Sequence, residues 1–188
     1  MLIDAGHGGK DPGAVGGYGG LVRHSVREKD AVLAVALEVG AILRSQNVEV
    51  MFTRSDDTFI PLAQRVAIAN RSGARLMLSL HADASDNGSA SGFTVYLGRN
   101  PSRASITAAS AIAGEMTAGD FMSRGIRRHP KTIRVINEPR IPSVLVEMGY
   151  VSNSAEAAQF DRADHRRRLA AAIAAGVIDY LSPQAWTR

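Results

Sequence analysis

The chain has 188 residues, of which 45% are hydrophobic and 21% are charged. This balance is typical of one globular domain and excludes a disordered chain. The net charge is only +4 and no aromatic-rich basic stretch is present, so we expect no nucleic-acid partner. The absence of cysteine excludes disulfides and cysteine-ligated zinc. We also expect no membrane span and no signal sequence in this chain, because no apolar run is long enough to cross a bilayer and Met1 directly precedes the first strand.

The first half of the chain alternates short apolar runs with segments of helical period. We expect a strand over residues 1–4, then a helix over residues 30–45 whose apolar side chains recur on one face. A strand over residues 48–53 and a helix over residues 60–72 follow. Another strand is expected over residues 76–80. Between the first strand and the first helix, residues 5–29 form a glycine-rich loop, which is where α/β proteins often place their sites.

The second half continues the alternation. We expect a strand over residues 93–97, an alanine-rich helix over residues 102–117, and strands over residues 133–136 and 144–147. A helix over residues 162–181 follows, which Pro183 ends. The pattern predicts an α/β fold: one domain over residues 1–188, with a mostly parallel, twisted central sheet of about six strands and helices on both faces.

Three candidate metal ligands stand at the ends of expected elements: His7 after the first strand, Glu28 before the first long helix, and His81 after the strand over residues 76–80. Neighbouring parallel strands bring their carboxyl ends to one edge, so these side chains can converge. Two imidazoles and a carboxylate that leave a fourth position open are a known catalytic zinc set. The alternative is that each histidine only binds a loop carbonyl or caps a strand.

Other polar residues near these positions also need an interpretation. Glu147 directly follows a run of three apolar residues, and a carboxylate there is costly unless it is paired, solvated or part of a site. Asp4 and Asp83 flank the two candidate histidine ligands and are candidates to orient them. The remaining histidines, His24, His129 and His165, are expected on the solvated surface.

Five stretches of this sequence together resemble the zinc N-acetylmuramoyl-L-alanine amidases of the cell-separation type, the Amidase_3 family. They occur in the family's order and the resemblance covers nearly the whole chain. The stretches are residues 4–13, 27–33, 59–66, 79–84 and 144–153.

The resemblance implies a peptidoglycan hydrolase that cuts the amide bond between N-acetylmuramic acid and the L-alanine of the stem peptide. It implies one Zn²⁺ per chain, bound by His7, Glu28 and His81, with Glu147 as the catalytic general base. Peptidoglycan is then the partner, the cell envelope is the location, periplasmic or extracellular, and we expect a monomer.

Some relatives in this family carry an insertion, between the positions of Leu97 and Ile133, that folds as a helix and plugs the zinc site until a LytM-type activator displaces it. This chain has room there for little more than one helix. Glu115 on that helix is a candidate blocking ligand, but we expect an open site that requires no activator.

Two other functions compete with the amidase interpretation. A non-catalytic peptidoglycan-binding module would not need Glu147 beside three metal ligands. A zinc peptidase acting on cell-wall peptides commonly carries a His-x-x-Glu pairing, and His7 is followed by no such pairing.

Overall fold

The computed structural model describes residues 1–20 and 24–182, which fold around a six-stranded sheet. Four of its neighbouring strand pairs are parallel, and only the pair between β6 and β8 is antiparallel. This arrangement confirms the mostly parallel sheet predicted from the sequence. In spatial order the strands are β4 (Met51–Phe52), β1 (Leu2–Ala5), β5 (Met77–Asp83), β8 (Ser143–Tyr150), β6 (Phe93–Leu97) and β7 (Ser123–Arg128).

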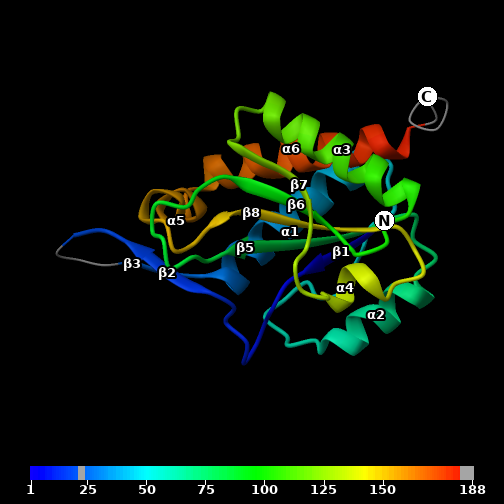
Figure 1. Ribbon diagram of the computed structural model, residues 1–188, viewed down its shortest axis with the longest axis horizontal. Helices are drawn as coiled ribbons and strands as arrows, with labels where there is room; N and C mark the ends of the chain where they lie inside the picture. The colour runs from blue at the N-terminus through cyan, green and yellow to red at the C-terminus, as the bar shows by residue number, and fades with distance from the viewer. Residues whose placement is uncertain (21–23, 183–188) are drawn as a thin grey trace.

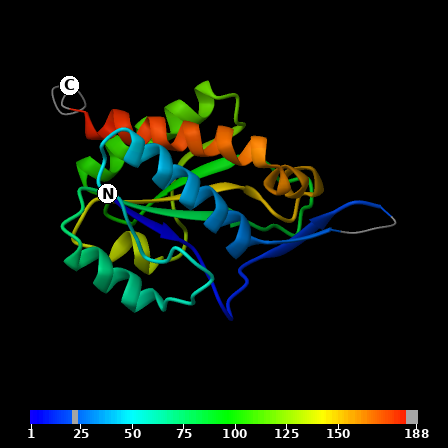
Figure 2. The same ribbon diagram turned by 180° about the vertical axis from the view of Figure 1, so that it is seen from behind.

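Helices cover both faces of this sheet (Figures 1 and 2). One face packs against α1 (Glu28–Ser45), α3 (Arg103–Ala118) and α6 (Ala163–Leu181), and the other against α2 (Leu62–Arg71) and α4 (Arg134–Asn137). A short helix, α5 (Ser154–Asp161), follows β8. Within the described helices, none combines the length and apolarity that a bilayer crossing requires.

Alternation along the strands decides which side chains share a face. Leu78 and Val146 join the core under α1, α3 and α6, whereas Met77 and Leu145 join the smaller core under α2 and α4. Successive side chains of a strand point to opposite faces, so residues two apart share one. The smaller core also contains Leu2, so the polar residues two or four positions beyond its members lie on the α2 and α4 face; they are Asp4, Ser79, His81 and Glu147.

The structure corrects several expected elements. The predicted strand over residues 133–136 is wrong: Arg134–Asn137 form the helical turn α4, in which Val135 and Ile136 are buried and Arg134 reaches Glu138 one turn later. The predicted strand over residues 48–53 shortens to Met51–Phe52. The strand β7, the helix α5 and a hairpin were not predicted. The expected helix end at Pro183 lies outside the described residues.

That hairpin pairs β2 (Val15–Tyr18) with β3 (His24–Arg27) in antiparallel register. It extends away from the body of the domain (Figures 1 and 2). It occupies the stretch of chain between His7 and Glu28, and Glu28 begins α1 directly after β3. The hairpin therefore connects two of the candidate ligands while leaving them free to meet at the sheet.

Candidate metal centre

The three candidate ligands converge. His7, Glu28 and His81 offer ligand atoms that all lie within 4.8 Å of one another. Glu28 Oε1 lies 3.0 Å from His7 Nε2 and 2.8 Å from His81 Nδ1. The two imidazole rings stand edge to face with their centroids 4.9 Å apart. Two imidazole nitrogens and a carboxylate oxygen facing one point form a donor set that fits a divalent transition metal such as zinc.

Glycines allow this close approach. A Cβ on Gly6 would lie 2.3 Å from His81 Cε1, and a Cβ on Gly13 would lie 2.6 Å from Glu28 Oε2. His7 itself has a φ of 59°, in the left-handed region that side chains rarely adopt. Local strain of this kind persists only where the surroundings impose it, and it is frequent at functional sites.

Two buried arginines impose that path, and sequence reasoning missed both. Arg54 donates from Nε to Ala5 O at 2.9 Å and from Nη2 to Gly6 O at 2.6 Å. Arg65 donates from Nη1 to Ala5 O at 2.6 Å and from Nη2 to His7 O. Only 4% and 2% of these two residues is exposed, so each guanidinium depends on these carbonyls to satisfy its donors. The pair thereby holds the backbone that presents His7.

Glu28 is held in its ionised form. Burial alone would raise its pKa, but hydrogen bonds with His7 and His81 outweigh burial and hold the pKa of Glu28 well below its usual range. Backbone N–H groups add to this, because Oε2 accepts from Ala14 N at 2.8 Å and Oε1 accepts from Ala82 N at 3.1 Å. A carboxylate that stays charged in a buried position is well prepared to bind a cation.

Asp11 orients His7, a role that was not predicted. Its Oδ2 lies 2.9 Å from His7 Nδ1, and its Oδ1 accepts from Gly13 N at 3.1 Å. The contact fixes the ring so that Nε2 faces Glu28. Metal-binding imidazoles commonly use their second nitrogen in this way. The sequence signal was a carboxylate four residues after His7 in the glycine-rich loop.

The residues proposed to orient the histidines lie further from the rings. Asp4 accepts hydrogen bonds of 2.7 Å from each of Thr53, Arg65 and Ser79. Asp83 accepts from Ala84 N at 2.8 Å. Across residues 1–20 and 24–182, neither carboxylate hydrogen-bonds an imidazole of His7 or His81. Any effect of Asp4 on His7 therefore passes through Arg65, and the orienting roles of Asp4 and Asp83 stay predictions.

Glu147 lies beside the three candidate ligands without contributing to their convergent set. It pairs in register with His81 across β5 and β8. Its Oε2 is shut off from solvent and, within the described part of the chain, has no hydrogen-bond partner. Burial raises the pKa of Glu147 well above its ordinary value, and the nearby charges of Glu28 and Asp83 raise it further. A carboxylate with this environment in a cavity is a candidate proton carrier.

These groups open into one cavity of about 390 Å³. Its lining contains the three candidate ligands and Glu147, together with His129 and residues 132–135. The volume lies in the range of pockets that bind small ligands. The helix α3, which carries Glu115, packs on the opposite face of the sheet with α6, so Glu115 is remote from this cavity.

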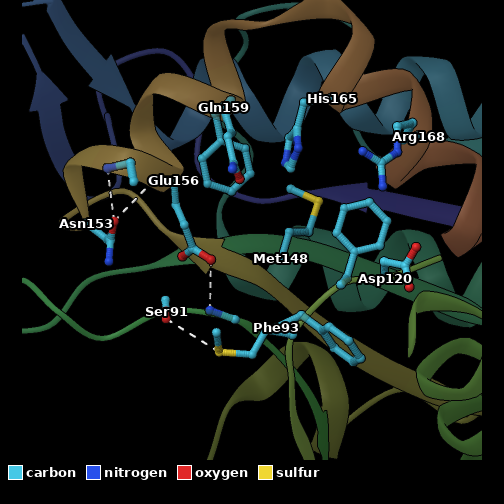
Figure 3. A pocket seen from close by; sticks show the side chains of 14 residues that line it. Ser91, Phe93, Asp120, Met148, Asn153, Glu156, Gln159, His165 and Arg168 are labelled. Carbon is cyan, nitrogen blue, oxygen red and sulfur yellow. Dashed lines mark hydrogen bonds between the residues drawn. The ribbon is translucent and has the colours of Figure 1, made fainter. Parts of the chain in front are cut away.

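A second cavity of about 380 Å³ lies between α5, the start of α6 and β6 (Figure 3). Its central carboxylate, Glu156, accepts from Gly92 N at 2.8 Å and Tyr150 N at 2.7 Å, which makes it a structural tie. His165 is half-buried there, its ring 5.7 Å from that of Phe121. His165 is therefore less exposed than the expected position on the solvated surface implies. Among the described residues, only the first cavity holds a cluster of side chains that could bind a metal ion.

Comparison with known proteins agrees with this geometry. The sequence profile of the N-acetylmuramoyl-L-alanine amidase family, Amidase_3, matches residues 1–179. This chain belongs to that family. It is therefore a peptidoglycan amidase, and so a hydrolase, as the resemblance of its motifs implied. Membership in an amidase family also favours the amidase over the binding module and the peptidase.

Individual relatives match along almost the whole chain. N-acetylmuramoyl-L-alanine amidase AmiA of Escherichia coli is 33% identical, over 96% of this chain and 75% of the relative. The catalytic domain of the amidase CwlV from Bacillus (Paenibacillus) polymyxa superposes with a TM-score of 0.84 at 39% identity, over 96% of each chain. The CwlD amidase of Clostridioides difficile, solved in complex with the GerS lipoprotein, has a TM-score of 0.86 at 26% identity, over 96% of each chain.

Proposed function

We propose that residues 1–188 form a zinc amidase catalytic domain, in which His7, Glu28 and His81 bind one Zn²⁺ and Glu147 is the catalytic general base. The proposed reaction is hydrolysis of the amide between N-acetylmuramic acid and the L-alanine of the stem peptide. One observation carries the assignment of roles. Glu147 lines the same cavity as the three converging ligands, yet its buried oxygen is bound by none of the described residues.

The chemistry divides between the metal and the protein. When bound, zinc supplies a Lewis acid that polarises a carbonyl and makes a water molecule acidic enough to attack near neutral pH. Glu147 accepts the proton of the attacking water and then delivers it to the nitrogen of the leaving L-alanine. Asp11 holds the ring of His7 in place during these steps. No covalent bond between protein and substrate is required.

The raised pKa of Glu147 suits both proton transfers. A carboxylate with an ordinary pKa would be a weak base toward water and, once protonated, would lose its proton to solvent readily. Burial raises the pKa and thereby strengthens the base, bringing it closer to the pH at which the enzyme works. The positive charge of a bound metal would oppose part of this rise.

We further propose that the site is open and works in the cell envelope, as a monomer and without an activator. Support comes from α3, which packs against α6 on the far face of the sheet instead of over the ligands. The substitution Glu115→Gln should leave the digestion rate unchanged. A large increase in rate for Glu115→Gln, or activity only after an activator is added, would show that the site is blocked in the free protein.

The test of the function uses the whole chain loaded with one equivalent of zinc and purified peptidoglycan. We expect release of stem peptides that begin with free L-alanine, and loss of that release after chelation. Mass spectrometry identifies these peptides directly. Release of glycan fragments, or of peptides cut within the stem, would contradict the proposal.

A further inference from the structure

One stretch of this chain concentrates positive charge beside the proposed active site. Residues 121–137 contain no aspartate or glutamate, and the net charge of the whole chain is only +4. The stretch runs from the edge strand β7 to α4, and its later part forms a wall of the active-site cavity. Its cations are Arg124, Arg127, Arg128, Lys131 and Arg134.

Three of these cations either already contact another group of the protein or lie on the other face of the sheet. Arg134 forms a two-pronged ion pair with Glu138, at 2.6 and 2.7 Å. Arg124 donates to Ser91 O at 3.2 Å and lies over the ring of Tyr150 at 5.3 Å. Arg128 pairs in register with Leu97, a residue of the core on the α3 face, and so lies away from the site.

Arg127 differs from these neighbours because it lies on the same sheet face as the site. It pairs in register with Tyr96, which pairs with Leu145, and Tyr96 packs in the same core cluster as Leu145. The Tyr96 ring lies 4.7 Å from the ring of His129, and both His129 and Leu145 line the active-site cavity. Neighbouring side chains on this face of the sheet therefore connect the cavity to Arg127.

The guanidinium of Arg127 is available for a ligand. The residue is exposed, and its Nε donates to Arg124 O at 3.0 Å. Within residues 1–20 and 24–182 it forms no ion pair, unlike Arg134 nearby. A guanidinium whose remaining N–H groups face solvent matches a carboxylate in geometry and charge.

We propose that Arg127 binds a free carboxylate of the stem peptide while the amide next to the sugar lies at the metal centre. The inference rests on the proposed function and adds a substrate preference, namely for stem peptides whose carboxylates are free over those in which they are amidated. The peptide, not the sugar, is the natural partner. The lactyl carboxyl of the sugar is consumed in the scissile amide, whereas residues further along the stem carry free carboxylates.

Direct binding tests this preference without relying on turnover. The probes are two soluble muropeptides that differ only in having free or amidated stem carboxylates, titrated by calorimetry at low salt. In the zinc-loaded Glu147→Gln background, we expect the free form to bind roughly 3- to 10-fold more tightly, as suits one partly exposed charge pair. Adding Arg127→Gln should abolish the difference, and adding Arg127→Lys should restore part of it.

The matched control is Arg167→Gln, an exposed arginine on α6, across the sheet from the site. It should preserve the preference. Equal binding of the two probes, no binding of either, or equal loss in both arginine variants would overturn the inference. A different outcome is that the preference depends on Arg127 but the parent chain, which keeps Glu147, cleaves neither probe. That outcome would contradict the proposed function and leave the binding role of Arg127 intact.

Discussion

The substitution Glu147→Gln should lower the turnover of the enzyme and raise the stability of its fold. The parent fold keeps a carboxylate whose Oε2 is buried and without a partner among the described residues, beside the charges of Glu28 and Asp83. Glutamine has nearly the same shape and carries no charge. We therefore expect the metal-free variant to be more stable than the metal-free parent at neutral pH, although the turnover of the zinc-loaded variant falls by about 10²- to 10⁴-fold.

The stability gain comes from the charge that glutamine lacks, because its amide is still a buried polar group; an uncompensated buried charge costs at least as much as a neutral unsatisfied group, about 1–3 kcal/mol. For a chain of this length, each 1 kcal/mol corresponds to about 2–4 °C in Tm. The sign depends on pH. Because the folded pKa of Glu147 is raised above its ordinary value of 4.5, the parent loses stability as pH rises from that value through the folded pKa. The variant lacks this loss, so the difference in Tm should disappear below about pH 4.

The assay is thermal unfolding of both metal-free proteins in chelator across this pH range, with zinc content and muropeptide turnover measured on separate zinc-loaded samples. Near-parental zinc content is expected, because Glu147 is outside the convergent ligand set. The reasoning would be refuted by a variant that is less stable than the parent at neutral pH, that loses zinc, or that keeps near-parental turnover.

Three further predictions concern the metal centre. His81→Ala should reduce bound zinc from about one per chain to near zero in metal analysis, and a fully occupied variant would remove His81 from the ligand set. Asp11→Asn should weaken zinc binding by about 10- to 100-fold in a chelator competition, because it disturbs the contact with His7 Nδ1. The control is Asp86→Asn at an exposed position, and equal zinc affinities of the two variants would contradict the orienting role of Asp11. Gly6→Ala should also lose zinc, since its Cβ would lie 2.3 Å from His81 Cε1. Gly114→Ala, with open space around the new Cβ, should retain zinc. Retention of zinc by both variants would show that the His81 ring can move aside.

The sequence predicted those parts of the fold whose signal is local. Phe93–Leu97 and the long helices have strong apolar periodicity, and the structure places them close to the expected bounds. The edge strand β7 was missed because it reads Ser-Arg-Gly-Ile-Arg-Arg, and an edge strand with charged side chains lacks the alternation that marks a half-buried strand. Residues 133–136 were assigned the wrong structure because a short apolar run does not distinguish one helical turn from a strand.

The convergence of the site was predictable for a different reason. His7, His81 and Glu147 follow or lie within parallel strands, and the carboxyl ends of such strands meet at one edge whatever the rest of the chain does. Asp11, Arg54 and Arg65 were not predicted as site residues, since their roles depend on a loop path that no periodicity encodes. Long-range contacts of side chains with backbone carbonyls become visible only in three dimensions.

Hydrolysis of peptidoglycan in water enriched in ¹⁸O tests the central claim most directly, because it shows which bond water attacks. The account predicts that one ¹⁸O atom appears in the lactyl carboxylate of N-acetylmuramic acid and none in the released stem peptide. The label should be absent after chelation, and with Glu147→Gln it should appear about 10²- to 10⁴-fold more slowly. Incorporation of ¹⁸O into a carboxylate of the stem peptide would show cleavage of a peptide bond, and would contradict the assignment of this site as an N-acetylmuramoyl-L-alanine amidase.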